Sequence, residues 1–331
     1  MSEMVVVILN LNFITAMTAI IILNWNNAND TIHCLSSLTK ADGDFRVYVV
    51  DNGSTDDSLQ RINEWVDRNR DIEVSVVPLD MNYGFAKGNN KGIAFALQHN
   101  PDYFLLLNND TEVKSDFLTR IFDFKQRHPE YSVLTPKIYF FSDKKKIWNC
   151  GGKLSMGFRK YYYAGQGDDA IKESEFIPIT LVTGCALFFP AELLDADNRL
   201  LTERFFFGEE DFEFSMRMSA QGVKMACVLD SILYHKVGAS GSRMSGLGKI
   251  YLHFLNRFID IRLHKSALFY ALWSLVNIPL CLRHFYRSSR SLGRSMKLTS
   301  RLLSDARRKD GVSQADFVAL VLDGTYFDKT K

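Results

Sequence analysis

Short runs of Val, Ile, Leu and Tyr alternate with longer segments of helical periodicity between Thr18 and Asn109, and this alternation is the strongest constraint on the fold. Each run is too short to form a helix, and its unbroken apolar character is typical of a strand covered on both faces. The pattern predicts an α/β fold with a mostly parallel sheet flanked by helices. We expect strands at residues 18–23, 46–50, 74–77 and 103–107, and helices at 30–38, 57–68 and 84–98.

Composition narrows the class of partner. The chain has 331 residues, with 40 Lys and Arg against 38 Asp and Glu, so its formal net charge of +2 provides no chain-wide basic field for nucleic acid. Its five cysteines are scattered and lack the spacing of a zinc finger or of a disulfide framework. We therefore expect a cytoplasmic protein that does not bind nucleic acid.

Residues 1–16 form an N-terminal extension to the predicted domain. Residues 5–12 are nearly repeated by residues 19–26, and Met17 stands just before the second copy. The extension lacks the basic residues that open a secretory signal. Two explanations stay open, since translation either begins at Met17 or the extension adds an edge strand. The α/β domain then covers residues 17–248, and a C-terminal helical segment follows at 249–331.

Polar residues that follow the predicted strands should meet at one edge of the sheet, where a ligand is expected. Asp51 ends the second strand, and its carboxylate suits a base or a ribose, although a simple turn and helix cap explains the same position. Further along, Gly84, Gly88 and Gly92 form one bare stripe on a helix. The helix start at Gly84, with Lys87, suits a diphosphate, and close packing of the helix on the sheet is the alternative.

The fourth predicted strand ends in Asn108, Asn109 and Asp110. Mg²⁺ and Mn²⁺ prefer oxygen ligands and are commonly held by one or two carboxylates together with substrate phosphates. Asp110 suits that role, and an Asn-Asp turn without a metal is the alternative. His235 follows a short apolar strand and precedes a glycine-rich loop, so it is either a ligand or a structural histidine.

Four carboxylates lie within five positions beside the aromatic run 205–207. Carboxylates in the first turn of a helix stabilise it through the helix dipole, so the cluster can be explained without a ligand. An apolar environment, however, raises the pKa of a carboxyl group towards the range of a general base. One of the four can therefore act as a base while its neighbours cap the helix. They are Glu209, Glu210, Asp211 and Glu213.

Taken in order, these segments resemble the family 2 nucleotide-sugar glycosyltransferases, in particular the bacterial branch with rhamnosyltransferases and galactofuranosyltransferases of surface polysaccharide. The resemblance covers about residues 18–242. It implies a GT-A fold and a metal-dependent transfer that inverts the anomeric centre. It also implies a donor such as dTDP-rhamnose or a UDP-sugar, and a saccharide or lipid-linked saccharide as acceptor, in biosynthesis of the O-antigen or capsule type.

The resemblance also assigns roles to particular residues. Asp110 and His235 would hold Mg²⁺ or Mn²⁺ under the diphosphate, and Asp211 would be the catalytic base. Glu210 and Gly184 would lie near the acceptor. The donor would be surrounded by Leu23, Asn24, Trp25, Asp51, Asn82, Gly84, Lys87, Asn108 and Asn109. Asn108 stands where the family's DXD motif has its first Asp, so we expect a weakly bound metal.

The C-terminal segment combines an apolar stretch with a basic one. Residues 266–282 carry no charge, but a span of the membrane needs about 20 apolar residues, and this stretch contains Ser274, Asn277 and Pro279. An interfacial helix is therefore expected. The basic residues up to Lys309 would attract it to an anionic leaflet, whereas a solvated face or a subunit contact is the alternative. We expect peripheral attachment to the inner face of the cytoplasmic membrane.

Two other functions are compatible with these sequence features. A sugar-phosphate nucleotidyltransferase also needs an α/β nucleotide site and a divalent metal. A non-catalytic saccharide-binding or assembly subunit would keep the fold without the reaction.

Overall fold

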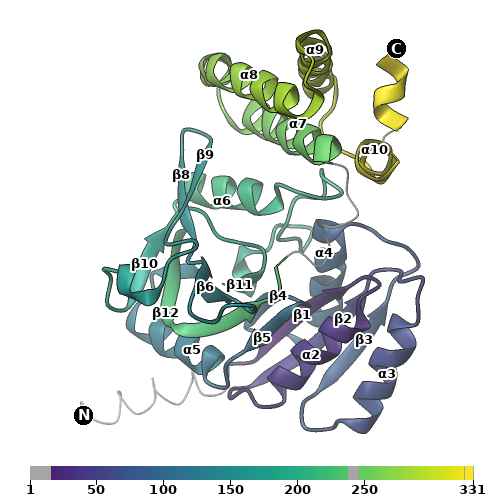
Figure 1. Cartoon of the computed structure of the whole chain (residues 1–331). Helices are drawn as coiled ribbons and strands as arrows, with labels where there is room; N and C mark the ends of the chain where they lie inside the picture. The colour runs from purple at the N-terminus through teal and green to yellow at the C-terminus, as the bar shows by residue number, and fades with distance from the viewer. Residues whose placement is uncertain (1–15, 238–245, 324, 331) are drawn as a thin grey trace.

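A sheet of ten strands runs through the described part of the chain and is covered by helices on both faces (Figure 1). The computed structural model describes residues 16–237, 246–323 and 325–330. Eight strands follow one another in the order β10-β12-β6-β11-β4-β1-β2-β3, while β5 pairs with β12 and β7 with β6. The proposed extra edge strand before residue 16 and residues 238–245 of the glycine-rich loop lie outside the described residues, whereas Gly246 and Gly248 begin a helix.

The first half of the chain forms the parallel part of the sheet. β1 pairs in parallel with both β2 and β4, and β2 pairs in parallel with β3, so the predicted α/β pattern is confirmed. In this register Asn24 lies opposite Asp51, and Leu23 lies opposite Asn108, all at the carboxyl ends of their strands. The elements are β1 (Thr18–Asn24), α2 (Ala28–Leu38), β2 (Phe45–Asp51), α3 (Ser58–Arg68), β3 (Val74–Pro78), α4 (Phe85–Ala96) and β4 (Tyr103–Asn108).

The second half adds antiparallel pairs to the sheet. The apolar run 179–190 is not continuous, because a turn at residues 180–185 divides it between two strands that lie apart in the sheet. β8 and β9 form a separate two-stranded antiparallel hairpin. The elements are β5 (Thr111–Val113), α5 (Phe117–Arg127), β6 (Tyr131–Phe140), β7 (Ile147–Asn149), β8 (Gly152–Ser155), β9 (Phe158–Tyr161), β10 (Phe176–Ile179), β11 (Ala186–Pro190), α6 (Glu210–Ala220) and β12 (Lys224–His235).

Alternate residues of each strand enter different cores, as the two-residue repeat of a strand requires. In β1, Ile20 and Ile22 face the core beneath α2, α3 and α5, while Ala19 and Ile21 face the core beneath α4 and α6. The glycine stripe of α4 lies against the second of these faces. A Cβ atom at Gly92 would lie 2.6 Å from side-chain carbons of Ile21 and Val50, so the stripe serves close packing on the sheet.

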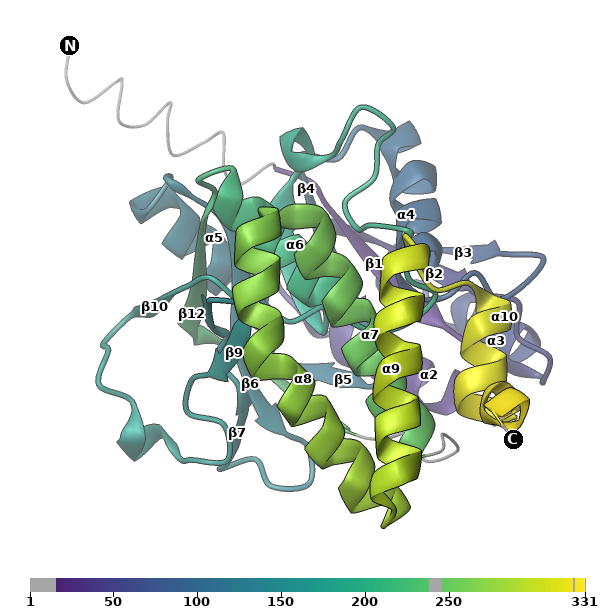
Figure 2. The same cartoon turned by 90° about the horizontal axis from the view of Figure 1, so that it is seen from above.

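The C-terminal helices form a third core with the outer side of α6 (Figures 1 and 2). Phe212 and Met216 of α6 point into this core, whereas Phe214 and Met218 point towards the sheet. α7 is buried between α6 and the hairpin of α8 and α9, so it belongs to the body of the protein. The elements are α7 (Gly246–His264), α8 (Ala267–Ser289), α9 (Leu292–Arg308), α10 (Gln314–Phe317), and the short helical turns Val318–Leu322 and Thr325–Thr330.

We predict that Gly92→Ala lowers the free energy of unfolding by about 1–3 kcal/mol, because the added methyl group overpacks the contact with the sheet. Urea denaturation of both proteins measures the difference. Gly293→Ala is the matched control, since it adds the same methyl group to α9 where no heavy atom lies within 4 Å. Equal effects of the two replacements would show that packing at Gly92 does not matter.

Candidate active site

A chain of hydrogen bonds crosses the carboxyl ends of the parallel strands. The amide of Asn109 donates to Oγ1 of Thr31 (3.0 Å), and that hydroxyl donates to Oδ1 of Asn24 (2.8 Å). Asn24 in turn donates through Nδ2 to Oδ1 of Asp51 (2.7 Å). Three residues predicted from the sequence are therefore joined directly or through Thr31. No motif in the sequence marks Thr31 as part of this chain. It links Asn24 and Asn109 because it lies one turn into α2, next to Asn24.

Asp51 is almost completely buried and also closes the turn that follows β2. The hydroxyl of Ser54 donates to Oδ1 (2.6 Å), and the backbone N–H of Ser54 donates to Oδ2 (3.1 Å). The local contacts of Asp51 are therefore those of a turn residue, the alternative given above to a contact with a base or a ribose. Trp25 lies on the same edge with half of its surface exposed, which leaves an aromatic face open beside the strand ends.

Asp110 and His235 meet because β5 pairs with the end of β12. His235 lies opposite Thr111 in that ladder, and the backbone N–H of Lys236 donates to the carbonyl of Asp110 (2.9 Å). Nε2 of His235 lies 3.0 Å from Oδ1 of Asp110, and each residue is only 7% exposed. Trp148 packs edge-on against the imidazole, with ring centroids 4.3 Å apart.

The pair fits a small divalent cation. Among the described residues, neither Oδ1 of Asp110 nor Nδ1 of His235 has a hydrogen-bond partner. Two adjacent ligands of an octahedral ion with bonds of about 2.1 Å are separated by about 3 Å, which is close to the observed spacing. Among the described residues, no group of three or more His, Cys, Asp or Glu side chains is arranged to hold a metal ion, so Asp110 and His235 would supply two ligands to such an ion.

Glu209 immediately precedes α6 and is the most strongly held of the four carboxylates. Its φ of 73° lies in the left-handed region, which side chains with a Cβ atom rarely adopt. Oε2 contacts Arg257 (2.6 Å) and Arg159 (2.7 Å), and Oε1 lies 2.8 Å from Nδ1 of His253. Burial alone would raise the pKa of Glu209, but these partners outweigh it and lower the pKa to about 2.

Glu210 and Asp211 have fewer positively charged partners than Glu209, so the effect of burial on their pKa values is not outweighed. Burial raises the pKa of Glu210 to about 8, and the neighbouring charge of Asp211 adds to the shift. Oε1 of Glu210 accepts a hydrogen bond from the backbone N–H of Gly208 (2.7 Å). Burial also raises the pKa of Asp211, whereas the charge of Arg159 opposes the rise. The Asp211 side chain keeps 25% of its surface exposed, so a substrate can reach it.

Two connections bring the start of α6 to the sheet edge. The backbone N–H of Phe85 donates to the carbonyl of Phe206 (3.2 Å), which ties the loop before α6 to the start of α4. On the other side, the N–H of Val182 donates to Oγ of Ser215 (3.1 Å). The turn that contains Val182 also reaches β4, because the carbonyl of Cys185 accepts from the N–H of Asn108 (2.8 Å).

Other predicted residues lie around α4 and have structural contacts. Oδ1 of Asn82 accepts hydrogen bonds from Asn52 and from the N–H of Gly84. Gly84 has a φ of 82°, and a Cβ atom there would lie 2.1 Å from the carbonyl oxygen of Phe206. Lys87 is directed towards Glu203, with 3.9 Å between their charged atoms.

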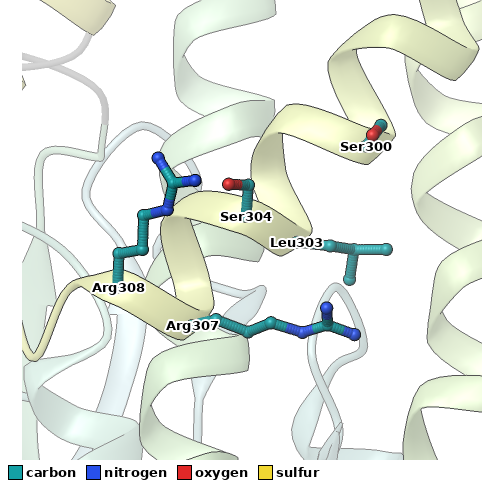
Figure 3. A pocket seen from close by; sticks show the side chains of 5 residues that line it. All are labelled: Ser300, Leu303, Ser304, Arg307 and Arg308. Carbon is teal, nitrogen blue, oxygen red and sulfur yellow. The ribbon is translucent and has the colours of Figure 1, made fainter.

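Leu23 and Gly184 also make close packing contacts. A Cβ atom at Gly88 would lie 2.7 Å from a methyl carbon of Leu23, and one at Gly184 would lie 3.3 Å from the Phe85 ring. The hydrogen-bond chain that joins Asn24, Asp51 and Asn109 does not include these two residues or the residues around α4. The hollow in Figure 3 also lies elsewhere, since all of its lining residues belong to α9.

Residues 19–194 match the family described as Glycosyl transferase family 2, and this match covers more than half of the chain. The chain therefore belongs to family 2 of the glycosyltransferases. Family membership identifies an enzyme of the hexosyltransferase class, rather than a nucleotidyltransferase or a non-catalytic assembly subunit.

Two curated relatives are also glycosyltransferases by name. The low-salt glycan biosynthesis hexosyltransferase Agl10 of Haloferax volcanii is 24% identical over 246 residues, which are 73% of this chain and 74% of the relative. The dTDP-rhamnosyl transferase RfbF of Shigella flexneri is 20% identical over 218 residues, covering 63% of this chain and 71% of the relative.

Solved structures of similar fold confirm the predicted GT-A architecture. Residues 1–349 of S. aureus TarS, in complex with UDP-GlcNAc, superpose with a TM-score of 0.58 at 18% identity, over 88% of this chain and 80% of that one. The mannosyltransferase PcManGT of Pyrobaculum calidifontis, in complex with GDP-Man and Mn²⁺, gives 0.53 at 15% identity, over 94% and 80% of the chains.

Proposed function

We propose that the enzyme transfers a sugar from a nucleoside-diphosphate donor to a saccharide acceptor in one inverting, metal-dependent displacement. The observation that carries this proposal is the position of Asp211. Its accessible carboxylate lies at the start of α6, which hydrogen bonds tie both to α4 and, through the turn at residues 180–185, to the strand that ends in Asn108. A base is thus available on the side of the sheet edge where a donor would lie.

The choice of donor follows from the relatives. The names and titles of TarS, PcManGT and RfbF refer to UDP-GlcNAc, GDP-Man and dTDP-rhamnose respectively. For this enzyme we propose a dTDP-rhamnose or UDP-sugar donor, held along the edge of Asn24, Trp25 and Asp51. Surface polysaccharide biosynthesis is the proposed pathway.

Asp211 accepts the proton of an acceptor hydroxyl while that oxygen attacks the anomeric carbon from the face opposite the diphosphate. The new carbon–oxygen bond forms as the bond to the diphosphate breaks, and the bonding electrons leave with the diphosphate. Asp110 and His235 would hold Mg²⁺ or Mn²⁺, which would stabilise the negative charge of that leaving group.

The donor and the base are tested together. We expect one nucleotide sugar in a panel of UDP-, dTDP- and GDP-sugars to release its nucleoside diphosphate. With that donor, Asp211→Asn should reduce turnover by roughly 10²- to 10⁴-fold, because the amide cannot accept the proton, and should leave donor affinity almost unchanged. Asp230→Asn, an exposed carboxylate on β12, is the control.

A fully active Asp211→Asn enzyme, or one that loses only donor affinity, would reject Asp211 as the base. Glu210→Gln in the same assay then shows whether the neighbouring carboxylate acts instead. No release from any donor in the panel by the wild-type enzyme would contradict the proposed reaction.

The metal site has its own prediction. Asp110→Ala should abolish, and His235→Ala should weaken, the binding of donor in the presence of Mn²⁺, because both side chains approach one ion. Calorimetry with and without Mn²⁺ measures this. Asp123→Ala removes an exposed carboxylate of α5 and serves as the control. Unchanged Mn²⁺-dependent affinity in both site variants would remove the assignment.

We further propose that α8 and α9 attach the enzyme to an anionic membrane surface, where a lipid-linked acceptor would be available. α8 is the one helix in the described residues that is long and apolar enough to cross a membrane, by length and composition only. One of its faces is packed into the third core, which favours an interfacial position over a span. The buried residues of that face are Trp273, Asn277, Cys281 and Phe285.

The opposite surface of the same helical hairpin carries both kinds of side chain that a lipid surface attracts. α8 and α9 form the outer layer of the molecule, on the far side of α7 from the sheet (Figures 1 and 2). Its exposed apolar residues are Leu268, Leu272, Leu275, Val276, Leu292 and Met296. Its exposed basic residues include Arg283, Arg287, Arg290, Arg294 and Lys297, each worth about 1 kcal/mol near an anionic leaflet.

We predict that the double replacement Leu272→Glu with Leu275→Glu weakens binding to vesicles of phosphatidylglycerol and phosphatidylcholine by more than about tenfold, because two apolar side chains become anionic. Flotation measures binding. Arg68→Glu with Arg70→Glu changes charge at the far end of the molecule and is the control. Equal flotation of wild type and the α8 variant would contradict the proposed surface.

A further inference from the structure

We propose that Arg159, on strand β9, is the positioning residue that holds the base Asp211, an inference that rests on the proposed function. Arg159 lies about fifty residues before α6 in the sequence, in a polar segment without helical periodicity. The structure brings it to the first turn of α6.

One guanidinium group contacts two of the carboxylates at that turn. Nη2 of Arg159 lies 2.7 Å from Oε2 of Glu209 and 3.4 Å from Oδ1 of Asp211, and its side chain is 18% exposed. On the other side, Nη1 lies 3.3 Å from the hydroxyl of Tyr161. The planar fork lets one nitrogen contact both carboxylates while the other is held by Tyr161, and a lysine ammonium has no second arm to be fixed in this way.

The hairpin that carries Arg159 is itself fixed by the C-terminal helices. Gly157, at its tip, has a φ of 76° and accepts a hydrogen bond from Nη1 of Arg257 (3.0 Å). A Cβ atom at Gly157 would lie 2.6 Å from Nε1 of Trp273, so the tip fits closely against α8. Arg257 also binds Glu209. The β8–β9 hairpin, the start of α6 and helix α7 therefore each contact the other two.

The aromatic ring of Phe212 completes the arrangement. The guanidinium of Arg257 lies 3.7 Å from the centroid of this ring, and that of Arg159 lies 5.2 Å from it. Phe212 thus supports both arginines from the first turn of the same helix that carries Asp211. The position of Arg159 is set by packing as well as by charge.

The charges around Asp211 come from three elements. The positive groups of β9 and α7 offset the negative charge of the carboxylates at the start of α6. Asp260 of α7 is a further buried carboxyl group, and burial raises its pKa well above the ordinary value. Loss of Arg159 removes one of the two positive charges that act on Asp211, and Arg257 is then left to oppose Glu209. The surrounding groups are Arg159 and Tyr161 of β9, Glu209 and Glu210, and His253, Arg257 and Asp260 of α7.

A direction for the pH dependence follows. Burial raises the pKa of Asp211, and the charge of Arg159 opposes that rise. Removing Arg159 therefore raises the pKa further, so that a higher pH is needed to keep the base ionised. The acid limb of the pH–rate profile should shift to higher pH in a variant without the positive charge.

The test is the pH dependence of nucleoside diphosphate release, with the donor that turns over in the panel and with water as the acceptor. For Arg159→Gln we expect the acid limb to move up by about one pH unit, with donor affinity almost unchanged. Lys160→Gln, an exposed position on the same strand, is the matched control and should keep the wild-type profile. An unshifted acid limb in Arg159→Gln would overturn the proposal.

Arg159→Lys gives a second measurement and decides the matter if Arg159→Gln fails to fold by circular dichroism. The ammonium keeps the charge but loses the second arm that Tyr161 holds and the planar group over Phe212, so we expect the wild-type acid limb with turnover about tenfold lower. Wild-type turnover in Arg159→Lys would overturn the bridging role. A fully active Asp211→Asn enzyme would instead reject the base on which this inference rests, and no release from any donor by the wild-type enzyme would reject the proposed function, so the three failures are distinguished.

Discussion

The buried, ionised carboxylate of Glu209 is the point on which the start of α6 depends. A charge taken out of water is costly unless it is paired and hydrogen-bonded, and Glu209 obtains partners from β9 and α7 at once. Those partners fix the first turn of α6, which carries both Asp211 and the aromatic support of the arginines. The C-terminal helices thus share one packed body with the helix that carries the proposed base.

Much of the fold could be predicted because, in the first half of the chain, the local sequence pattern indicates each strand and helix. The four strands from β1 to β4 end within two residues of their expected limits, since parallel strands buried on both faces leave continuous apolar runs. The division of the run 179–190 into β10 and β11 could not be predicted in the same way. Ile179 ends β10, which pairs with β12, whereas residues 186–190 form β11, which pairs with β4 and β6, and the apolar pattern does not record which distant strand a segment will join.

The same distinction holds for the site. Asn24, Asp51, Asn109 and Asp110 could be predicted because the carboxyl ends of parallel strands must meet, whatever the details of packing. The partners that orient such residues have no local signal. Thr31 looks like any helical threonine, and Trp148, which packs on His235, lies in a segment without clear periodicity. Their roles depend on contacts between residues far apart in the sequence.

The close fit between Gly157 and Trp273 has a consequence for protein engineering. One engineering experiment is a chimera in which this enzyme receives the C-terminal helices of a relative. In this protein such an exchange would place a foreign helix surface against a hairpin tip that has no room for a side chain. A chimera that folds should therefore take residues 157–161 from the same parent as the helices, because these two separate stretches of the chain pack against each other.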